Sequence, residues 1–360
     1  MIRWLPAVLL FLLSCSRLLP PKRPDVPASN VLVATTTDFT TGFLSVMDLS
    51  TYKVYSAIEP IHSDAVVRYE NGSFFVINRL GADNIEKLIP QTSFYPAYEV
   101  SVSSKANPQD IAIVSNTLAA ISLYGKNYLL WVNPETGQEV GRTDLSSFAD
   151  DDGLPEASGL IYEAGKIFLT AQRLNRNTSG YWLPVGTSYL LEISPITKSV
   201  ETAYPLPFAN PVSDIVSDGT SLYMAAPATF AASFTADGGI VQLDLATRSF
   251  QTSPLTETQT GYEISDLCFS NNKLFLLGLA SDYSSILAVF DRNTQSLSTL
   301  KTIPSSEGGF FSGLICDSLH VYVGDRTITN PGVRIIDSAT NAVGNPISLG
   351  LPPFSIAIIP

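Results

Sequence analysis

The sequence predicts an all-β fold, a seven-bladed β-propeller with four-stranded antiparallel blades, and three observations predict it. A pattern of short apolar strands recurs at a spacing of roughly 45 residues, a period typical of propeller blades. Short polar turns of one recurring type join the strands. Each end of the 360-residue chain carries part of one further blade. With 23 glycines, 24 prolines and only 15% charged residues, the composition is that of a turn-rich chain.

Each repeat begins with a short apolar segment, which we expect to be the innermost strand of a blade. These segments are DAVVRY (64–69), QDIAIV (109–114), SGLIY (158–162), SDIVS (213–217), SDLCF (265–269) and SGLIC (312–316). A tight polar turn and a second apolar segment follow, for example SFFVIN (73–78) and KLFLLG (273–278). Apolar runs of this length between turn residues are typical of buried strands.

The turn after the third strand of each repeat is the most regular part of the chain. It has Asp, Asn or Ser, then two variable residues and usually a Thr. Examples are LLWVNPETGQEV (129–140), LLEISPITKSV (190–200), IVQLDLATRSF (240–250), LAVFDRNTQSL (287–297) and VRIIDSATNAV (333–343). Asp or Asn accepts a hydrogen bond from the backbone two residues on, so the pattern predicts a hairpin into a fourth strand.

The chain ends predict how the ring closes. Six repeats are complete, whereas the strands VLVATTT (31–37), FLSVMDL (43–49) and KVYSAI (53–58) lack an innermost partner. The segment PPFSIAII (352–359) has the pattern of one more innermost strand. Placed beside 31–37, it completes a seventh blade and removes the open sheet edge.

The N-terminus predicts export and lipid attachment. Residues 1–14 have a basic start and an apolar run too short to span a bilayer, as in a signal peptide. The residues leading to Cys15 resemble a bacterial lipobox, although an ordinary signal peptide with an incidental cysteine is the alternative. Ser16 after the cysteine favours the outer membrane. We expect residues 15–28 to form a lipidated, proline-rich tether and 29–360 the propeller.

The net charge of −12 argues against nucleic acid or an anionic membrane surface as partners, because both select basic patches. We therefore expect membrane contact through the lipid anchor only. Cys268 and Cys316 remain after Cys15. Aligned repeats place them one residue out of step, and hence on opposite sides of equivalent strands, so two buried free thiols are expected.

The Asp-x-x-Thr turns and strand starts such as NPQDIAIV (107–114) resemble those of YVTN-type propeller repeat proteins, over about residues 29–360. With DLSSFADDDGLPE (144–156) and TAQRLNR (170–176), the chain is similar to a set of poorly characterised bacterial lipoproteins. Its architecture also resembles lipoproteins that capture cobalamin for outer-membrane transporters. Such resemblance implies the fold, and not an activity.

The loop lengths indicate which face of the propeller binds. Connections between blades and loops joining second to third strands lie on one face, which we term the loop-rich face. It carries every long insertion, namely 146–156, 172–187, 227–239 and 253–262. The opposite short-turn face has only tight turns. Long loops on a rigid scaffold are where binding usually occurs, although neutral variation in loop length is the alternative.

Carboxylates near the channel mouth form the first candidate site. An aspartate opens four of the innermost strands, with Gly159 and Gly313 in the equivalent position of two others; the four are Asp64, Asp110, Asp214 and Asp266. Close like charges need a compensating cation or proton, and oxygen-rich sites suit Ca²⁺. Alternatively, each aspartate accepts hydrogen bonds from the backbone of the adjacent blade.

Two insertions supply the other candidates. Asp150, Asp152 and Glu156 have part of the spacing of a calcium loop, although the full EF-hand pattern is absent and a solvated acidic loop is the alternative. The longest insertion offers arginine forks for an anion and exposed aromatic rings: Arg173, Arg176, Tyr181 and Trp182. Arg173 is equally suited to a structural ion pair with the acidic loop.

The expected function is binding rather than catalysis. Only two histidines are present, and no phosphate-binding loop or Cys-x-x-Cys cluster appears. We expect an outer-membrane lipoprotein, on the periplasmic side or the cell surface, that binds a small ligand or a protein on its loop-rich face. A metal-dependent lactonase-type hydrolase is one alternative, since carboxylates and amides are sufficient ligands. A scaffold for outer-membrane protein assembly or transport is another.

Overall fold

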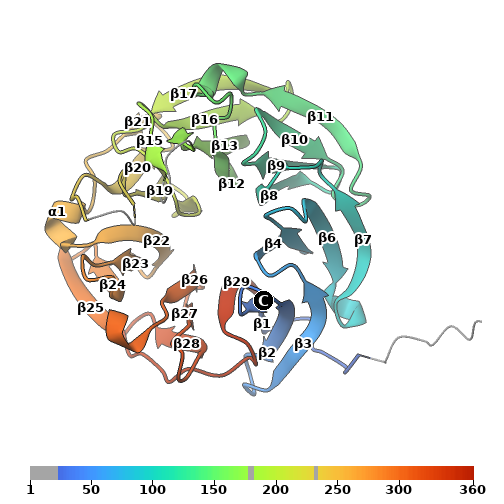
Figure 1. The fold of residues 1–360 in the computed structure, drawn as a ribbon, viewed down its shortest axis with the longest axis vertical. Coiled ribbons are helices and arrows are strands. Elements are labelled where there is room, and N and C mark those ends of the chain that lie inside the picture. Colours follow the sequence, from blue (N-terminus) through green and yellow to red (C-terminus); the bar gives the residue numbers. More distant parts are fainter. Residues whose placement is uncertain (1–22, 177–181, 231–233) are drawn as a thin grey trace, which may run out of the picture.

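The computed structural model describes residues 23–176, 182–230 and 234–360 and shows seven antiparallel sheets in a ring (Figure 1). The predicted seven-bladed propeller is thereby confirmed. The signal peptide, Cys15 and Tyr181 lie outside the described residues. Within the described ranges, no helix is long and apolar enough to cross a membrane.

The innermost strands, in order from blade 1 to blade 7, are β29 (Pro353–Ile359), β4 (Ala65–Glu70), β8 (Pro108–Ser115), β12 (Ala157–Glu163), β18 (Val216–Ser217), β22 (Glu263–Ser270) and β26 (Phe311–Cys316). The second strands are β1 (Val31–Thr37), β5 (Ser73–Asn78), β9 (Leu118–Leu123), β13 (Lys166–Ala171), β19 (Ser221–Ala226), β23 (Lys273–Leu279) and β27 (His320–Asp325). The innermost strand of blade 5 is shorter than the predicted 213–217.

The third strands are β2 (Gly42–Asp48), β6 (Asn84–Ile89), β10 (Tyr128–Val132), β16 (Tyr189–Ser194), β20 (Gly239–Asp244), β24 (Ser285–Asp291) and β28 (Gly332–Asp337). The fourth strands of blades 1 to 6 are β3 (Val54–Ile61), β7 (Tyr95–Ser101), β11 (Glu139–Asp144), β17 (Ser199–Pro205), β21 (Ser249–Phe250) and β25 (Ser296–Ile303). In blade 7, isolated bridges from Val333 to Ile347 and from Ile336 to Val343 take the place of a fourth strand. The loop insertions add the hairpin β14 (Leu174–Asn175) and β15 (Leu183–Pro184), and the helix α1 (Glu257–Thr260).

The last strand closes the ring as predicted. β29 pairs antiparallel with β1, with Val31 opposite Ile359 and Thr35 opposite Ser355. In Figure 1 the red C-terminal strand therefore lies beside the blue N-terminal strand. The side chain of Arg326 reinforces this closure, because its Nη atoms donate to the carbonyls of Pro352, Pro353 and Thr37.

The predicted hairpin mechanism is also confirmed. The side-chain oxygen that opens the turn after the third strand accepts the backbone N–H two residues on, in blades 1, 3, 5, 6 and 7. The acceptors are Asp48, Asn133, Asp244, Asp291 and Asp337. Each Asx turn satisfies a backbone donor that a tight turn would otherwise leave unpaired.

The core lies between neighbouring blades. One cluster, for example, joins Tyr223 and Ile240 of blade 5 to Ile264 and Leu274 of blade 6. Successive side chains of a strand point to opposite faces of its sheet. Because both faces of a blade pack against neighbours, the strands are apolar on both sides, which explains their nearly continuous apolar runs.

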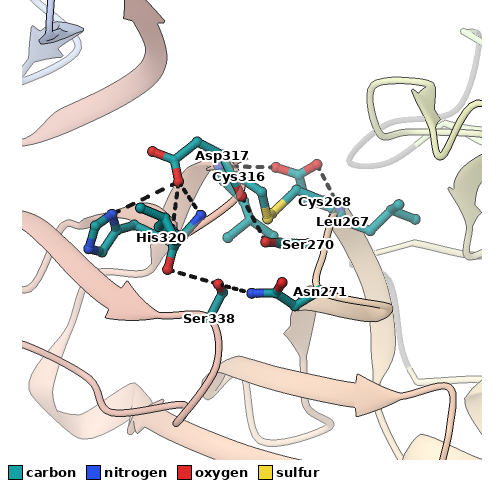
Figure 2. The surroundings of a disulfide bond; sticks show 11 residues. Leu267, Cys268, Ser270, Asn271, Cys316, Asp317, His320 and Ser338 are labelled. Carbon is teal, nitrogen blue, oxygen red and sulfur yellow. Dashed lines mark hydrogen bonds and ion pairs between the residues drawn. A yellow bond between two sulfur atoms is a disulfide. The ribbon is translucent and has the colours of Figure 1, made fainter. Parts of the chain in front are cut away.

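The prediction of two free thiols is wrong, because Cys268 and Cys316 form a disulfide with their Cα atoms 5.7 Å apart (Figure 2). Cys268 lies on β22 and Cys316 on β26, the innermost strands of adjacent blades. Adjacent blades pack face to face, so one side chain must point forward around the ring and the other backward. The one-residue offset between the repeats is therefore what brings the two sulfur atoms together.

Candidate functional site

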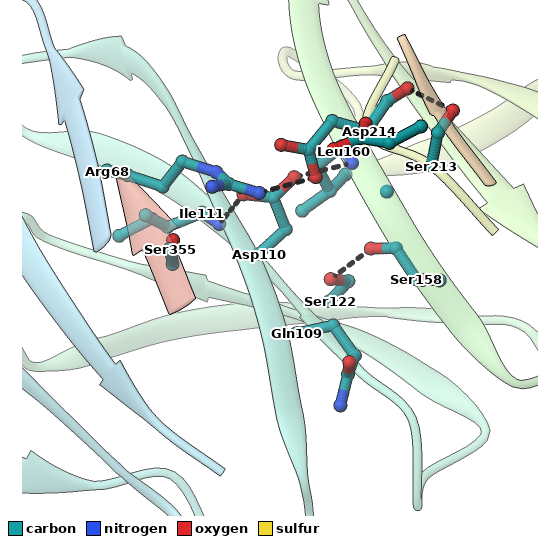
Figure 3. A network of polar contacts seen from close by, with 12 residues as sticks. Arg68, Gln109, Asp110, Ile111, Ser122, Ser158, Leu160, Ser213, Asp214 and Ser355 are labelled. Carbon is teal, nitrogen blue, oxygen red and sulfur yellow. Dashed lines mark hydrogen bonds and ion pairs between the residues drawn. The ribbon is translucent and has the colours of Figure 1, made fainter. Parts of the chain in front are cut away.

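A charged bridge crosses the central channel (Figure 3). Arg68 on β4 donates from Nε to Asp110 Oδ1 and from Nη2 to Asp214 Oδ1, each at 2.6 Å. Asp110 lies on β8, whereas Asp214 precedes β18 in blade 5, across the ring from blade 2 (Figure 1). One guanidinium therefore joins blades 2, 3 and 5 through the channel.

The aspartates of the innermost strands also hold neighbouring blades together. Asp110 Oδ2 accepts the N–H of Leu160 in blade 4 at 3.0 Å. Asp266 Oδ2 accepts that of Leu314 in blade 7 at 3.4 Å. These N–H groups lie on the channel edge of a strand that has no further strand beside it, so a side chain must satisfy them. Asp110 and Asp266 therefore have the alternative role given above, in which an aspartate accepts a hydrogen bond from the backbone of the adjacent blade.

The four predicted aspartates do not form one ring. Asp64 pairs with Arg79 Nη2 at 2.7 Å, apart from the Arg68 bridge. Asp110 is buried, while the side chain of Asp214 is 54% exposed. Ligand binding by these residues stays a prediction, and Asp214 is the member with the most accessible carboxylate in the bridge.

Burial dominates the electrostatics of the channel. Burial, with repulsion from Asp214, raises the pKa of Asp266 to about 7. Burial likewise raises the pKa of Glu70 to about 7, although its Oε2 accepts the N–H of Ile113. Burial alone would lower the pKa of Arg68, but the carboxylates of Asp110 and Asp214 outweigh it and the net shift is upward.

A cavity of about 350 Å³ lies in the channel. We call it the channel cavity; it is lined by Val67–Tyr69 of β4, Asp214–Ser217 around β18, Asp266–Phe269 of β22, Gly313–Cys316 of β26 and Ser355–Ile358 of β29. These strands run from the loop-rich face to the short-turn face. The first two residues of β4, β22, β26 and β29 do not line the cavity, so it lies in the half of the channel nearer the short-turn face.

On the loop-rich face, Arg176 lies between aromatic rings and acidic side chains. Its guanidinium carbon is 4.9 Å from the ring centre of Tyr124 and 5.2 Å from that of Trp182. Its Nε is 2.9 Å from Glu156 Oε1 and 3.9 Å from Asp152 Oδ2. Burial raises the pKa of the wholly buried Glu156 to about 7. The ion pair with the acidic loop is thus made by Arg176.

Arg173, the residue considered for that ion pair, has other contacts. Its Nη1 donates to the carbonyl of Thr187, and its guanidinium lies 5.8 Å from the ring centre of Tyr189. Arg173 has a left-handed φ of 58°, which belongs to the sharp turn after β13.

The acidic loop is organised by its own backbone. Asp150 Oδ1 accepts the N–H of Asp152 and Asp152 Oδ1 that of Leu154, while Gly153 has a φ of 84°. Among the described residues, no group of three His, Cys, Asp or Glu side chains is arranged to hold a metal ion. A calcium role for Asp150, Asp152 and Glu156 stays a prediction that no contact in this loop supports.

A cluster of aromatic rings on the loop-rich face was missed by the sequence analysis. Phe39, Phe310 and Phe354 surround the guanidinium of Arg326, at 4.5, 5.3 and 5.7 Å from their ring centres. Phe39 is 52% and Phe310 38% exposed, while Arg326 is only 7% exposed. Burial lowers the pKa of Arg326 to about 10, so it remains charged at neutral pH. The sequence signal that could have indicated this cluster is the presence of large apolar residues within otherwise polar loops.

These rings are part of a wider pattern. Most large apolar side chains exposed among the described residues lie on the loop-rich face: Phe39, Leu80, Trp182, Leu183, Tyr283, Phe310 and Ile328. The short-turn side exposes fewer, namely Tyr52, Ile196 and Leu319 in its turns and Tyr95 and Val140 at the start of β7 and β11. Exposed apolar residues that gather on one face are typical of a protein-binding surface.

No family model matches the chain, and no curated protein matches it. Solved structures are similar in fold. A putative 6-phosphogluconolactonase from Bacteroides fragilis is 10% identical with a TM-score of 0.63, over 92% of this chain and 98% of that one. A protein of unknown function from Desulfotomaculum acetoxidans is 11% identical with a TM-score of 0.62, over 92% and 99%. AztD from Citrobacter koseri is 11% identical with a TM-score of 0.54, over 91% and 96%. These bacterial β-propellers establish the fold alone.

Proposed function

We propose that this chain is an outer-membrane lipoprotein of the YVTN-repeat type, anchored through Cys15, whose loop-rich face binds a protein partner of the cell envelope. The observation that carries the proposal is the set of exposed aromatic and aliphatic side chains on that face. Phe39 and Phe310 project there over the buried guanidinium of Arg326. Aromatic and arginine side chains contribute most to the binding energy of protein interfaces.

A protein suits these residues better than a small ligand. The rings of Phe39 and Phe310 stack with centres 6.4 Å apart and an angle of 15° between their planes, which forms a flat apolar surface. The channel cavity, by contrast, lies toward the opposite face. A scaffold that assists assembly or transport of outer-membrane proteins would use the same surface.

The hydrolase alternative has no comparable support. A metal-dependent lactonase would need free carboxylates in the channel. Both oxygens of Asp110 are engaged, Oδ1 by Arg68 and Ile111 and Oδ2 by Leu160. The guanidinium of Arg68 occupies the position between Asp110 and Asp214 that a metal ion bridging the two carboxylates would take. We therefore favour binding over metal-assisted hydrolysis.

A matched pair of variants tests the proposal. Phe39→Ser and Tyr52→Ser each remove a ring that is 52% exposed from a residue with a left-handed φ, on opposite turns flanking β2. Partner capture from envelope extracts by the purified protein is expected to fall about tenfold or more with Phe39→Ser, as for an interface hot spot. Tyr52→Ser, on the short-turn face, is expected to bind normally. Equal capture by both variants would contradict the proposal.

A further inference from the structure

The channel cavity is a separate site on the opposite side of the molecule from the loop-rich surface. Its volume of about 350 Å³ is in the range of small-molecule pockets, which run from roughly 300 to 1,000 Å³. The Cys268–Cys316 disulfide lies in its wall and joins two of the strands that form it (Figure 2). The pocket is therefore held by covalent as well as packed contacts, as expected of a preformed site.

Polar and apolar groups occupy different ends of this cavity. Asp214 and Asp266 are the first lining residues of their strands, and the guanidinium of Arg68 reaches Asp214 at the same level. Beyond them toward the short-turn face the walls are mainly aliphatic and aromatic, including Phe269 and Ile358. The charged bridge thus lies at the end of the cavity nearer the loop-rich face, and the apolar walls lie nearer the short-turn face.

The charged end carries an excess of negative charge. Arg68 supplies one positive charge to two carboxylates, Asp110 and Asp214. Asp266, whose pKa is raised to about 7, adds a third carboxyl group that is partly ionised at neutral pH. Asp110 and Asp266 use both oxygens within the protein. Asp214 differs, because Oδ1 bonds Arg68 while Oδ2 has no hydrogen bond to any described residue. Asp214, whose side chain is 54% exposed and lines the cavity, therefore keeps one carboxylate oxygen that Arg68 does not bond.

We propose that the channel cavity binds a small organic ammonium ion, with Asp214 pairing the cation and the apolar walls holding its hydrocarbon part. A cation bound there would offset the repulsion among the carboxylates. An apolar group would fill the remaining space and release water from the walls. A carboxylate or phosphate ligand would meet the negative excess instead. This site does not depend on the proposed role of the loop-rich face.

The test uses probes that share a hydrocarbon part and differ in charge. Calorimetric titration of the purified protein compares 2-phenylethylamine, which is a cation at neutral pH, with neutral 2-phenylethanol and anionic 3-phenylpropanoate. The amine is expected to bind about tenfold or more tightly than either of the others. No binding of the amine at millimolar concentrations, or equal binding of all three, would overturn the proposal.

Variants assign the binding to this cavity. Asp214→Asn is expected to weaken amine binding about tenfold, whereas Asp244→Asn, in a turn of the same blade outside the cavity that asparagine also supports, leaves it unchanged. Ser217→Trp fills the cavity without changing its charge and is expected to abolish amine binding. Normal thermal unfolding of each variant confirms that it is folded. Equal losses with Asp244→Asn and Asp214→Asn, or full binding by Ser217→Trp, would place the amine elsewhere.

Discussion

Arg68 shows what a single residue can add to a repeat fold. In the sequence it is one polar position in a short apolar strand, and nothing marks it as different from neighbours that point outward. In the structure it joins Asp110 and Asp214, which lie 42 and 146 positions after Arg68 in the sequence. The aspartates were predicted, but their cation was not, because the contact depends on the width of the channel.

Buried carboxylates predict a stability that falls as the pH rises. The pKa of Glu70 is raised to about 7 in the folded protein, from an ordinary value of about 4.5. Between these values the folded state binds more protons than the unfolded state, so the contribution is full below the unfolded pKa and is lost as the pH rises through 7. Glu156, Glu257 and Asp266 have shifts in the same direction.

We therefore expect a lower unfolding midpoint at about pH 8 than at about pH 5. Glu70→Gln keeps a hydrogen-bond acceptor for Ile113 but carries no charge. It should therefore reduce the difference in the free energy of unfolding between the two pH values by about 1–2 kcal/mol. Aspartates with lowered pKa values, such as Asp244, change the stability only below about pH 4, so they do not mask the change between about pH 5 and about pH 8. Thermal unfolding followed by circular dichroism measures it; a midpoint that is flat or rises over this range would contradict the assignment.

At the scale of elements, turns were more predictable than contacts between blades. The Asx turns at Asp48 and Asp244 follow from local chemistry, since the side chain and the N–H that it accepts are two residues apart. The Cys268–Cys316 disulfide depends on how β22 faces β26 across a blade interface. The repeats show the one-residue offset correctly. Within one sheet that offset would keep the two cysteines apart, but across the interface between two blades it brings them together.

The disulfide is expected to stabilise the junction between blades 6 and 7. It closes a loop between positions 48 residues apart, for which chain entropy predicts about 4 kcal/mol, and native disulfides typically contribute about 2–4 kcal/mol. The double variant Cys268→Ser/Cys316→Ser should lower the free energy of unfolding by this amount. Denaturant unfolding of the oxidised protein, the reduced protein and the variant measures it. If the reduced protein unfolds at the same denaturant midpoint as the oxidised protein, the disulfide does not stabilise the fold.

The whole molecule was the most predictable level. Seven repeats, with one blade divided between the chain ends, leave few arrangements other than a closed ring, and β29 beside β1 confirms it. The direction of each strand then assigns every loop to a face. The loop-rich face could be named from loop lengths, but its aromatic cluster could not, because Phe39 and Phe310 meet only when blades 1 and 7 become neighbours.

Site-specific photocrosslinking in intact cells tests whether the loop-rich face contacts an envelope protein. A photoreactive phenylalanine replaces Phe39 on the loop-rich face or Tyr52 on the short-turn face, which are equally exposed. A discrete crosslinked protein species is expected from position 39 and none from position 52. The same species from both positions, or from position 52 alone, would contradict it.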